Sequence, residues 1–84
     1  MTFKNGLITQ TMAGSFIVID PARTDVIVKF NETSARIFEL LHTCGSDAEA
    51  AEALTEEYDI GIDKALADVR AIREKLISLG LAED

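Results

Sequence analysis

The sequence predicts an α+β fold in which three short strands are followed by three helices, in the order βββααα, and three observations predict it. Before Asn31, two runs at residues 15–19 and 26–30 are rich in β-branched and aromatic residues. After Asn31, apolar residues recur at helical spacing. The chain has 84 residues, 48% of them hydrophobic, which predicts one small domain with a dense core over residues 1–84.

The strand region is expected to form an antiparallel meander. Residues 7–12, 15–19 and 26–30 carry the strand pattern. Residues 13–14 (Ala-Gly) form a loop of hairpin length, and residues 20–25 form a turn in which Pro21 disfavours helix at its predecessor. Three strands joined in this way leave each outer strand with one open edge.

The first two helices are predicted from their capping residues. Asn31 is a good N-cap for a helix that runs through Leu41 and ends at residues 43–45. Ser46 and Glu49 have the spacing of a capping box and open a second helix that reaches about Tyr58.

The third helix is expected to be capped by Asp63 and to run to Leu79. Gly80 then occupies the position where a left-handed residue ends a helix, and Leu81 can pack back on the last turn. The second and third helices have helix-turn-helix spacing.

Charge and composition argue against several classes of protein. Fifteen acidic against eight basic residues give a net charge of −7, whereas domains that bind nucleic acid or anionic membranes usually carry the opposite sign. No apolar run is long enough to span a bilayer, and the first residues do not resemble a signal peptide. The single cysteine fits a reducing compartment, so a cytoplasmic domain is expected.

The third helix carries a wider apolar arc than a small core requires. The arc spans about 160°, against the roughly 100° that is typical of a helix on a core. One interpretation is that the extra width packs on the sheet while Arg73 extends outward. The other is that Leu66, Arg70, Arg73 and Ile77 line a groove that is half apolar and half cationic. An open edge on the third strand, with Lys29 as its single charge, suits a peptide added as a further strand, although Lys29 is also typical of a residue that protects an edge.

Few other residues of the sequence suggest a functional site. His42 and Cys44 are too few for a metal site, and no nucleophile or phosphate-loop motif accompanies them, so no catalytic residue, metal or cofactor is expected. The stretch 47–63 holds seven acids and no Lys or Arg, which suits a solvated face or a docking surface for a basic partner. A DNA-binding regulator and dimerisation through the open edge are further alternatives.

Residues 30–41 carry a more specific pattern, FNETSARIFELL. An apolar-Asn pair, a Ser-Ala step and an Ile-aromatic pair in this order resemble the PqqD-like family of peptide-binding domains, also called RiPP recognition elements. The similarity extends over residues 16–81 through Leu54, Tyr58, Val69 and the Gly80–Leu81 ending. Phe30 and Phe38 stand where this family more often has Leu and Trp.

The resemblance implies a winged helix-turn-helix fold and a non-catalytic function. Such a domain binds the leader segment of a ribosomally made precursor peptide as a strand added to the third strand, in a cleft against the third helix, and presents it to a modifying enzyme such as a radical SAM enzyme or leader peptidase. The pathway implied is PQQ, lasso-peptide or other radical-SAM-modified peptide synthesis, and the protein is expected to be a discrete monomer or weak dimer. The expected peptide-binding residues are Val26, Ile27, Val28, Lys29, Phe30, Leu66, Val69, Arg70, Arg73 and Ile77.

Overall fold

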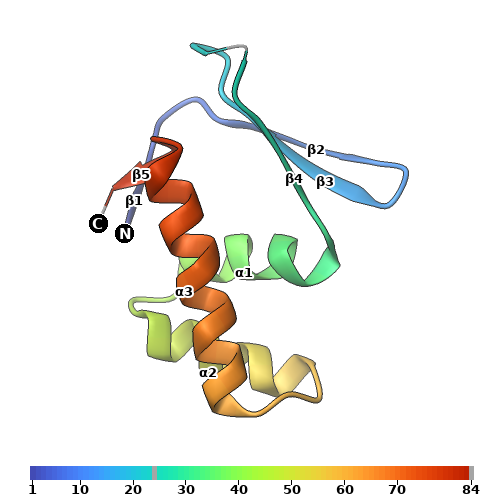
Figure 1. The fold of residues 1–84 in the computed structure, drawn as a ribbon, viewed down its shortest axis with the longest axis vertical. Coiled ribbons are helices and arrows are strands. Elements are labelled where there is room, and N and C mark those ends of the chain that lie inside the picture. The colour runs from blue at the N-terminus through green and yellow to red at the C-terminus, as the bar shows by residue number, and fades with distance from the viewer. Residues whose placement is uncertain (24, 84) are drawn as a thin grey trace.

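The computed structural model describes residues 1–23 and 25–83. Three helices gather on one side of a three-stranded sheet, and the two chain ends meet beside them (Figure 1). The elements are β1 (Thr2–Phe3), β2 (Ile8–Met12), β3 (Ser15–Ile19), β4 (Ile27–Phe30), α1 (Glu32–Thr43), α2 (Asp47–Glu57), α3 (Ile62–Ser78) and β5 (Ala82–Glu83).

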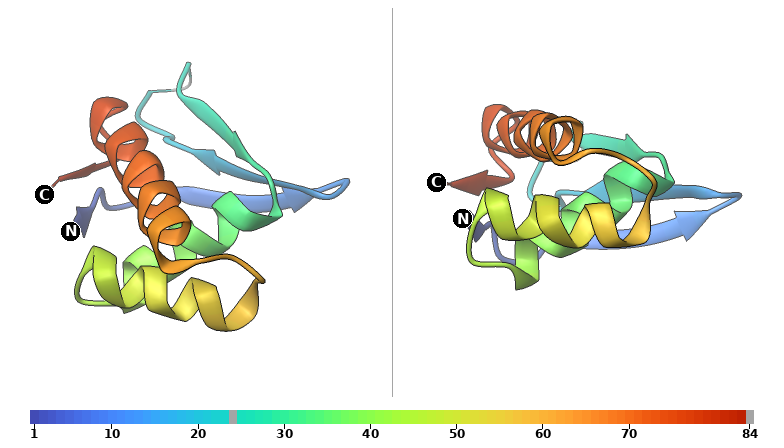
Figure 2. Two further views of the ribbon diagram at one scale, coloured as in Figure 1. Left: turned by 60° about the horizontal axis from the view of Figure 1, so that its bottom comes forward. Right: turned by 90° about the horizontal axis from the view of Figure 1, so that it is seen from below.

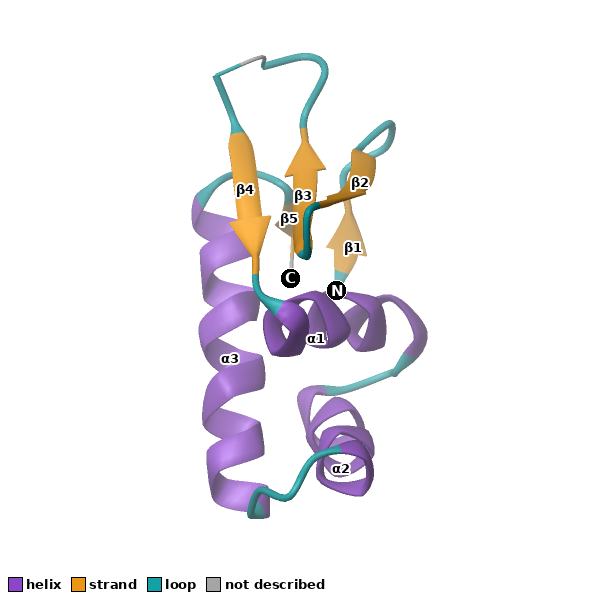
Figure 3. Ribbon diagram, turned by 90° about the vertical axis from the view of Figure 1, so that its right-hand side faces the viewer, coloured by secondary structure: helices purple, strands orange, loops and turns teal. Residues whose placement is uncertain are grey.

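The main sheet is the predicted antiparallel meander, with the strand order β2-β3-β4 (Figure 3). Its register places Phe16 opposite Phe30 and Ile17 opposite Lys29. Val26, expected in the third strand, lies just before β4 instead. Its N–H donates to the Arg23 carbonyl oxygen at 2.8 Å, so it closes the turn between β3 and β4.

A second, two-stranded sheet joins the two ends of the chain and was not predicted. Phe3 of β1 pairs with Ala82 of β5 in antiparallel register. Each strand has only two residues, and so short a segment shows no alternation of its own. The observed order is therefore the predicted βββααα with one short strand added at each end.

The predicted N-caps of α1 and α2 are confirmed. The Asn31 side chain accepts a hydrogen bond from the Ser34 N–H at 2.8 Å, and the Ser46 hydroxyl accepts one from the Glu49 N–H at 3.2 Å. The reciprocal half of the capping box differs from the usual pattern, because the Glu49 carboxylate accepts from the Gly45 N–H at 3.3 Å.

The prediction for the start of α3 was wrong by two residues. Gly61 is the N-cap and makes no side-chain capping bond, so Asp63 lies inside the first turn, where its charge still suits the helix dipole. The predicted end of the helix is confirmed. Gly80 has φ +74°, its N–H donates to the Ile77 carbonyl oxygen, and the N–H of Leu81 donates to the carbonyl oxygen of Leu76.

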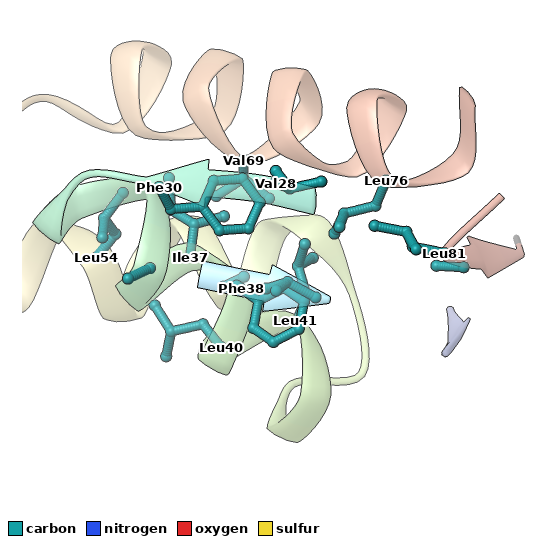
Figure 4. Packing of buried hydrophobic residues seen from close by; sticks show 14 of the residues in the cluster. Val28, Phe30, Ile37, Phe38, Leu40, Leu41, Leu54, Val69, Leu76 and Leu81 are labelled. Atoms are coloured by element: carbon teal, nitrogen blue, oxygen red, sulfur yellow. The ribbon is translucent and has the colours of Figure 1, made fainter. Parts of the chain in front are cut away.

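The core lies between α3, α1 and the inner face of the sheet (Figure 4). Phe38 of α1 contacts both aromatic rings of that face, with centroid distances of 5.7 Å to Phe16 and 5.9 Å to Phe30. Val69 and Leu76 of α3 are fully buried above them. The β2–β3 hairpin extends beyond the helices (Figure 2).

No helix in the described part of the chain is long and apolar enough to cross a membrane.

Candidate functional site

The candidate site begins at the open edge of β4. Within the described residues, β4 pairs only with β3, so its other edge has no strand partner. The Asp20 N–H donates to the Val26 carbonyl oxygen at 3.3 Å, immediately before β4. Hydrogen-bonded and non-hydrogen-bonded pairs alternate along an antiparallel ladder. The backbone groups of Ile27 and Lys29 therefore point to the open edge.

The side chains of β4 alternate between the two faces of the sheet. Val28 and Phe30 point into the core and are buried, whereas Ile27 and Lys29 lie on the outer face and are exposed. Val28 and Phe30 therefore pack beneath the cleft, whereas Ile27 and Lys29 present their backbone groups to the open edge. A side-chain contact between Lys29 and α3 is excluded by this alternation.

At 100° per residue, one side of α3 carries Lys64, Asp68, Ile72 and Lys75, and we call it the strand-facing flank because Lys75 lies against Phe30 of β4. The Lys75 Nζ atom lies 5.7 Å from the centroid of the Phe30 ring, which places this flank over the strand. Lys64 and Asp68 form an ion pair one turn apart, at 3.2 Å.

A hollow of about 400 Å³ lies where β4 passes into α1, next to the same flank. Residues of α1, α3 and the α2–α3 connection line it, and they include both apolar and polar side chains. The lining residues are Asn31, Thr33, Ser34, Ile37, Tyr58, Ile60, Lys64, Asp68, Ala71 and Ile72. A chain that follows the open edge of β4 past Phe30 would reach this hollow.

The expectation that Leu66, Arg70, Arg73 and Ile77 face β4 is not met. At 100° per residue these four residues share a side of α3 that we call the far flank, across the buried stripe of the helix from Lys75. The Arg73 Nε atom lies 3.6 Å from Oδ1 of Asp47 in α2, which confirms where this flank points. Val69, also expected at the site, is fully buried in the core between the two flanks.

The cause of this difference is the position of α2. Helix α3 packs on α2 as well as on α1, so its apolar arc is wide because it covers neighbours on two sides. Periodicity measures the width of an arc, but it does not tell which border faces a strand and which faces a helix.

A buried carboxylate holds the β3–β4 turn against the ends of the chain. Asp20 is 1% exposed, and its Oδ2 atom accepts from Lys4 Nζ at 2.6 Å and from Arg23 Nε at 3.2 Å. The Arg23 guanidinium also donates to the carbonyl oxygen of Leu79, the C-cap of α3. Arg23 therefore connects the turn before β4 to the end of α3. Strand β4 and helix α3 are the elements that border the cleft.

The hydrogen bond from Lys4 lowers the pKa of Asp20 to about 2, although burial of the carboxylate acts in the opposite direction. Sequence reasoning assigned residues 20–25 to a turn and missed this network. Asp20 and Arg23 have the spacing of a local ion pair, but Lys4 lies sixteen positions from Asp20, and no local pattern indicates such a pair.

The geometry of α3 also bears on the DNA-binding alternative. Two of its cations are already paired with acids, Lys64 with Asp68 and Arg73 with Asp47. The acidic α2 lies beside it, so the helix pair presents few cations to a phosphate backbone.

His42 lies outside the cleft and serves packing. Its ring stacks on Phe3 at a centroid distance of 3.6 Å, and its Nδ1 atom lies 2.8 Å from the Phe38 carbonyl oxygen. His42 thus helps to hold β1 on α1.

The fold and the open strand edge define a class of small α+β domains with a winged helix-turn-helix arrangement. Comparison with family models matches residues 16–82 to coenzyme PQQ synthesis protein D (PqqD), and the chain belongs to this family. Comparison with curated proteins returned no match.

Two solved structures share the fold. TbiB1 in complex with the TbiA(beta) leader peptide is 18% identical, with a TM-score of 0.82 over 99% of this chain and 95% of that chain. Lasso peptide synthetase B1 complexed with the leader peptide is 24% identical, with a TM-score of 0.83 over 98% of this chain and 95% of that chain.

Proposed function

We propose that this protein binds the leader segment of a ribosomally synthesised precursor peptide and presents it to a modifying enzyme, without catalysing a reaction itself. The observation that carries the proposal is the open edge of β4 beside the strand-facing flank of α3. An extended peptide added to such an edge gains main-chain hydrogen bonds, while pockets for alternate side chains provide specificity.

In this arrangement the leader backbone pairs with the free backbone groups of Ile27 and Lys29. Alternate side chains of an added strand then point to opposite faces of the sheet. Those on the inner side meet Ile72 and Lys75 of α3, and beyond Phe30 an apolar side chain enters the hollow. Those on the outer side lie next to Ile27 and Lys29.

Charge favours acidic residues in the leader. Lys75 lies at the inner side of the cleft and Lys29 at the outer side, and neither forms an ion pair with the described residues, in a chain whose net charge is −7. Backbone pairing and apolar burial would supply most of the affinity, and the cations would set specificity and association rate.

The comparisons support the class of ligand. The chain belongs to the PqqD family, and both similar structures are complexes with a leader peptide. The modifying enzyme would be a radical SAM enzyme or a leader peptidase of a PQQ, lasso-peptide or related pathway. The protein would act in the cytoplasm, where precursor peptides are made.

A titration of the ¹⁵N-labelled protein with leader segments of precursors encoded beside its gene tests the proposal. Saturable amide shifts at residues 27–30 and along the strand-facing flank are expected. Shifts confined to α2, or none with any neighbouring leader, would contradict it and favour a basic partner on the acidic second helix.

A further inference from the structure

The outer face of the sheet points away from the helices and is largely apolar, and in the described part of the chain several of its apolar side chains are exposed. Ile8 of β2, Ile19 of β3 and Ile27 of β4 stand in register across all three strands. Ile8 is 49% exposed and Ile27 is 61% exposed, while Ile19 between them is half-buried. They form a continuous row that we call the isoleucine row.

The rest of this face adds further apolar area and one charge. Next to the isoleucine row, Ile17 stands between Gln10 and Lys29, and towards the hairpin tip Met12, 53% exposed, pairs with Ser15. None of these positions in the described strands is an Asp or Glu. Among the described residues of the three strands, Lys29 is therefore the only charged residue on this face.

The grouping of these side chains is unusual. Among the described residues five large apolar side chains are exposed, and three of them, Ile8, Met12 and Ile27, lie on this one face. Single exposed apolar residues are ordinary on a protein surface, but a contiguous patch marks an interaction site.

We propose that the outer face of the sheet is the docking surface for the enzyme that modifies the bound peptide, through an apolar surface of that enzyme with a carboxylate facing Lys29. The choice of this partner rests on the proposed function. The location rests on the isoleucine row and on the charge of the face.

A second copy of this chain fits the face poorly. A two-fold pairing would oppose the same residues from each copy, so Lys29 would enter an apolar interface without an acid from the other face. Each copy would also bring a net charge of −7. A different protein supplies the carboxylate that this chain lacks here.

The face is also continuous with the proposed peptide site. A strand added to β4 extends the sheet, so its outward side chains lie beside Ile27 and Lys29 and enlarge the same surface. A protein docked there contacts both the domain and the peptide, while the inner side of the peptide stays in the cleft. Bound leader is therefore expected to raise the affinity of the enzyme.

The test uses the purified peptide-modifying enzyme encoded beside this gene, titrated calorimetrically into the wild-type protein and into Ile8→Asp. Ile8 lies on β2, two strands away from the open edge of β4. The variant should bind the enzyme at least about tenfold more weakly and bind the leader as the wild type does. Met12→Asp, near the exposed hairpin tip, repeats the test if Ile8→Asp folds poorly.

Glu52→Lys, on the exposed side of α2, is the matched control at another surface and should leave enzyme affinity unchanged. Several results would overturn the proposal: no enzyme binding by the wild type, equal binding by Ile8→Asp and Met12→Asp, or loss of binding with Glu52→Lys alone. A dimer seen by sedimentation and removed by Ile8→Asp would assign the face to a second copy. Leader binding, measured separately, shows whether the proposed function itself fails.

Discussion

Lys4 Nζ lies 2.6 Å from Oδ2 of Asp20, which is the only buried charged side chain among the described residues. Through Arg23 the same carboxylate is linked to the C-cap of α3. The first residues of the chain, the turn before β4 and the end of α3 thus meet at one carboxylate. The junction therefore joins the turn before β4 to the C-terminal end of α3.

Replacement of Asp20 by Asn should lower the melting temperature, because it leaves Lys4 and Arg23 without their carboxylate while Oδ1 can still accept from the Ala22 N–H. The folded-state pKa of Asp20 is lowered from 3.8 to about 2. Its stabilising contribution is therefore present above pH 3.8 and lost as the pH falls towards 2.

Thermal melts of wild type and Asp20→Asn across this pH range check the prediction. The two melting curves should converge as the pH falls. Asp59→Asn, at an exposed carboxylate, is the control and should change little. A difference between wild type and Asp20→Asn that stays constant down to pH 2 would show that ionisation of Asp20 contributes nothing.

Replacement of Asn31 by Ala should cost about 1 kcal/mol of stability, because the Ser34 N–H loses its side-chain acceptor at the start of α1. Urea unfolding measures the loss. Asn31→Asp keeps an acceptor and should be close to the wild type. If Asn31→Ala and Asn31→Asp lower the free energy of unfolding equally, loss of the capping acceptor does not explain the destabilisation.

The two flanks of α3 should differ in leader binding. Lys75→Glu puts an acid over Phe30 and should weaken binding of an acidic leader about tenfold, most strongly at low salt. Arg73→Gln is the matched control on the far flank, where the side chain faces Asp47. It should leave leader affinity unchanged. Fluorescence anisotropy of a labelled leader measures the affinity of both variants. A loss of affinity with Arg73→Gln but not with Lys75→Glu would place the peptide on the far flank.

Proline substitutions should separate the open edge of β4 from its paired edge. Lys29→Pro removes an N–H that points to the open edge, so leader binding should be lost while the β3–β4 ladder is kept. Lys29→Ala removes the charge alone and should weaken binding only in part.

Val28→Pro removes a ladder hydrogen bond and should unfold the domain, which circular dichroism detects. A folded Lys29→Pro variant that still binds the leader as the wild type does would exclude strand addition at β4.

Local signals in the chain were sufficient for most elements. Asn31, Ser46 and Gly80 act through hydrogen bonds to neighbours within five positions, so their roles can be recognised from sequence alone. The strands β3 and β4 are recognisable for a similar reason, since β-branched and aromatic residues favour the pleated backbone. The start of α3 was misplaced because Asp is as favourable as Ser at an N-cap, so Asp63 was the expected cap. In the structure Gly61 occupies the N-cap position.

The sequence by itself determined the order of the three main strands and the three helices, the N-caps of α1 and α2 and the end of α3, because each depends on residues close together in the chain. Only the tertiary structure decided which flank of α3 meets β4, since packing on α2 turned Arg73 towards Asp47 and left Lys75 over Phe30. It also decided that Lys4 meets Asp20 and that three isoleucines align across the sheet. Contacts between residues distant in the chain arise from how elements pack, and no local pattern encodes that arrangement.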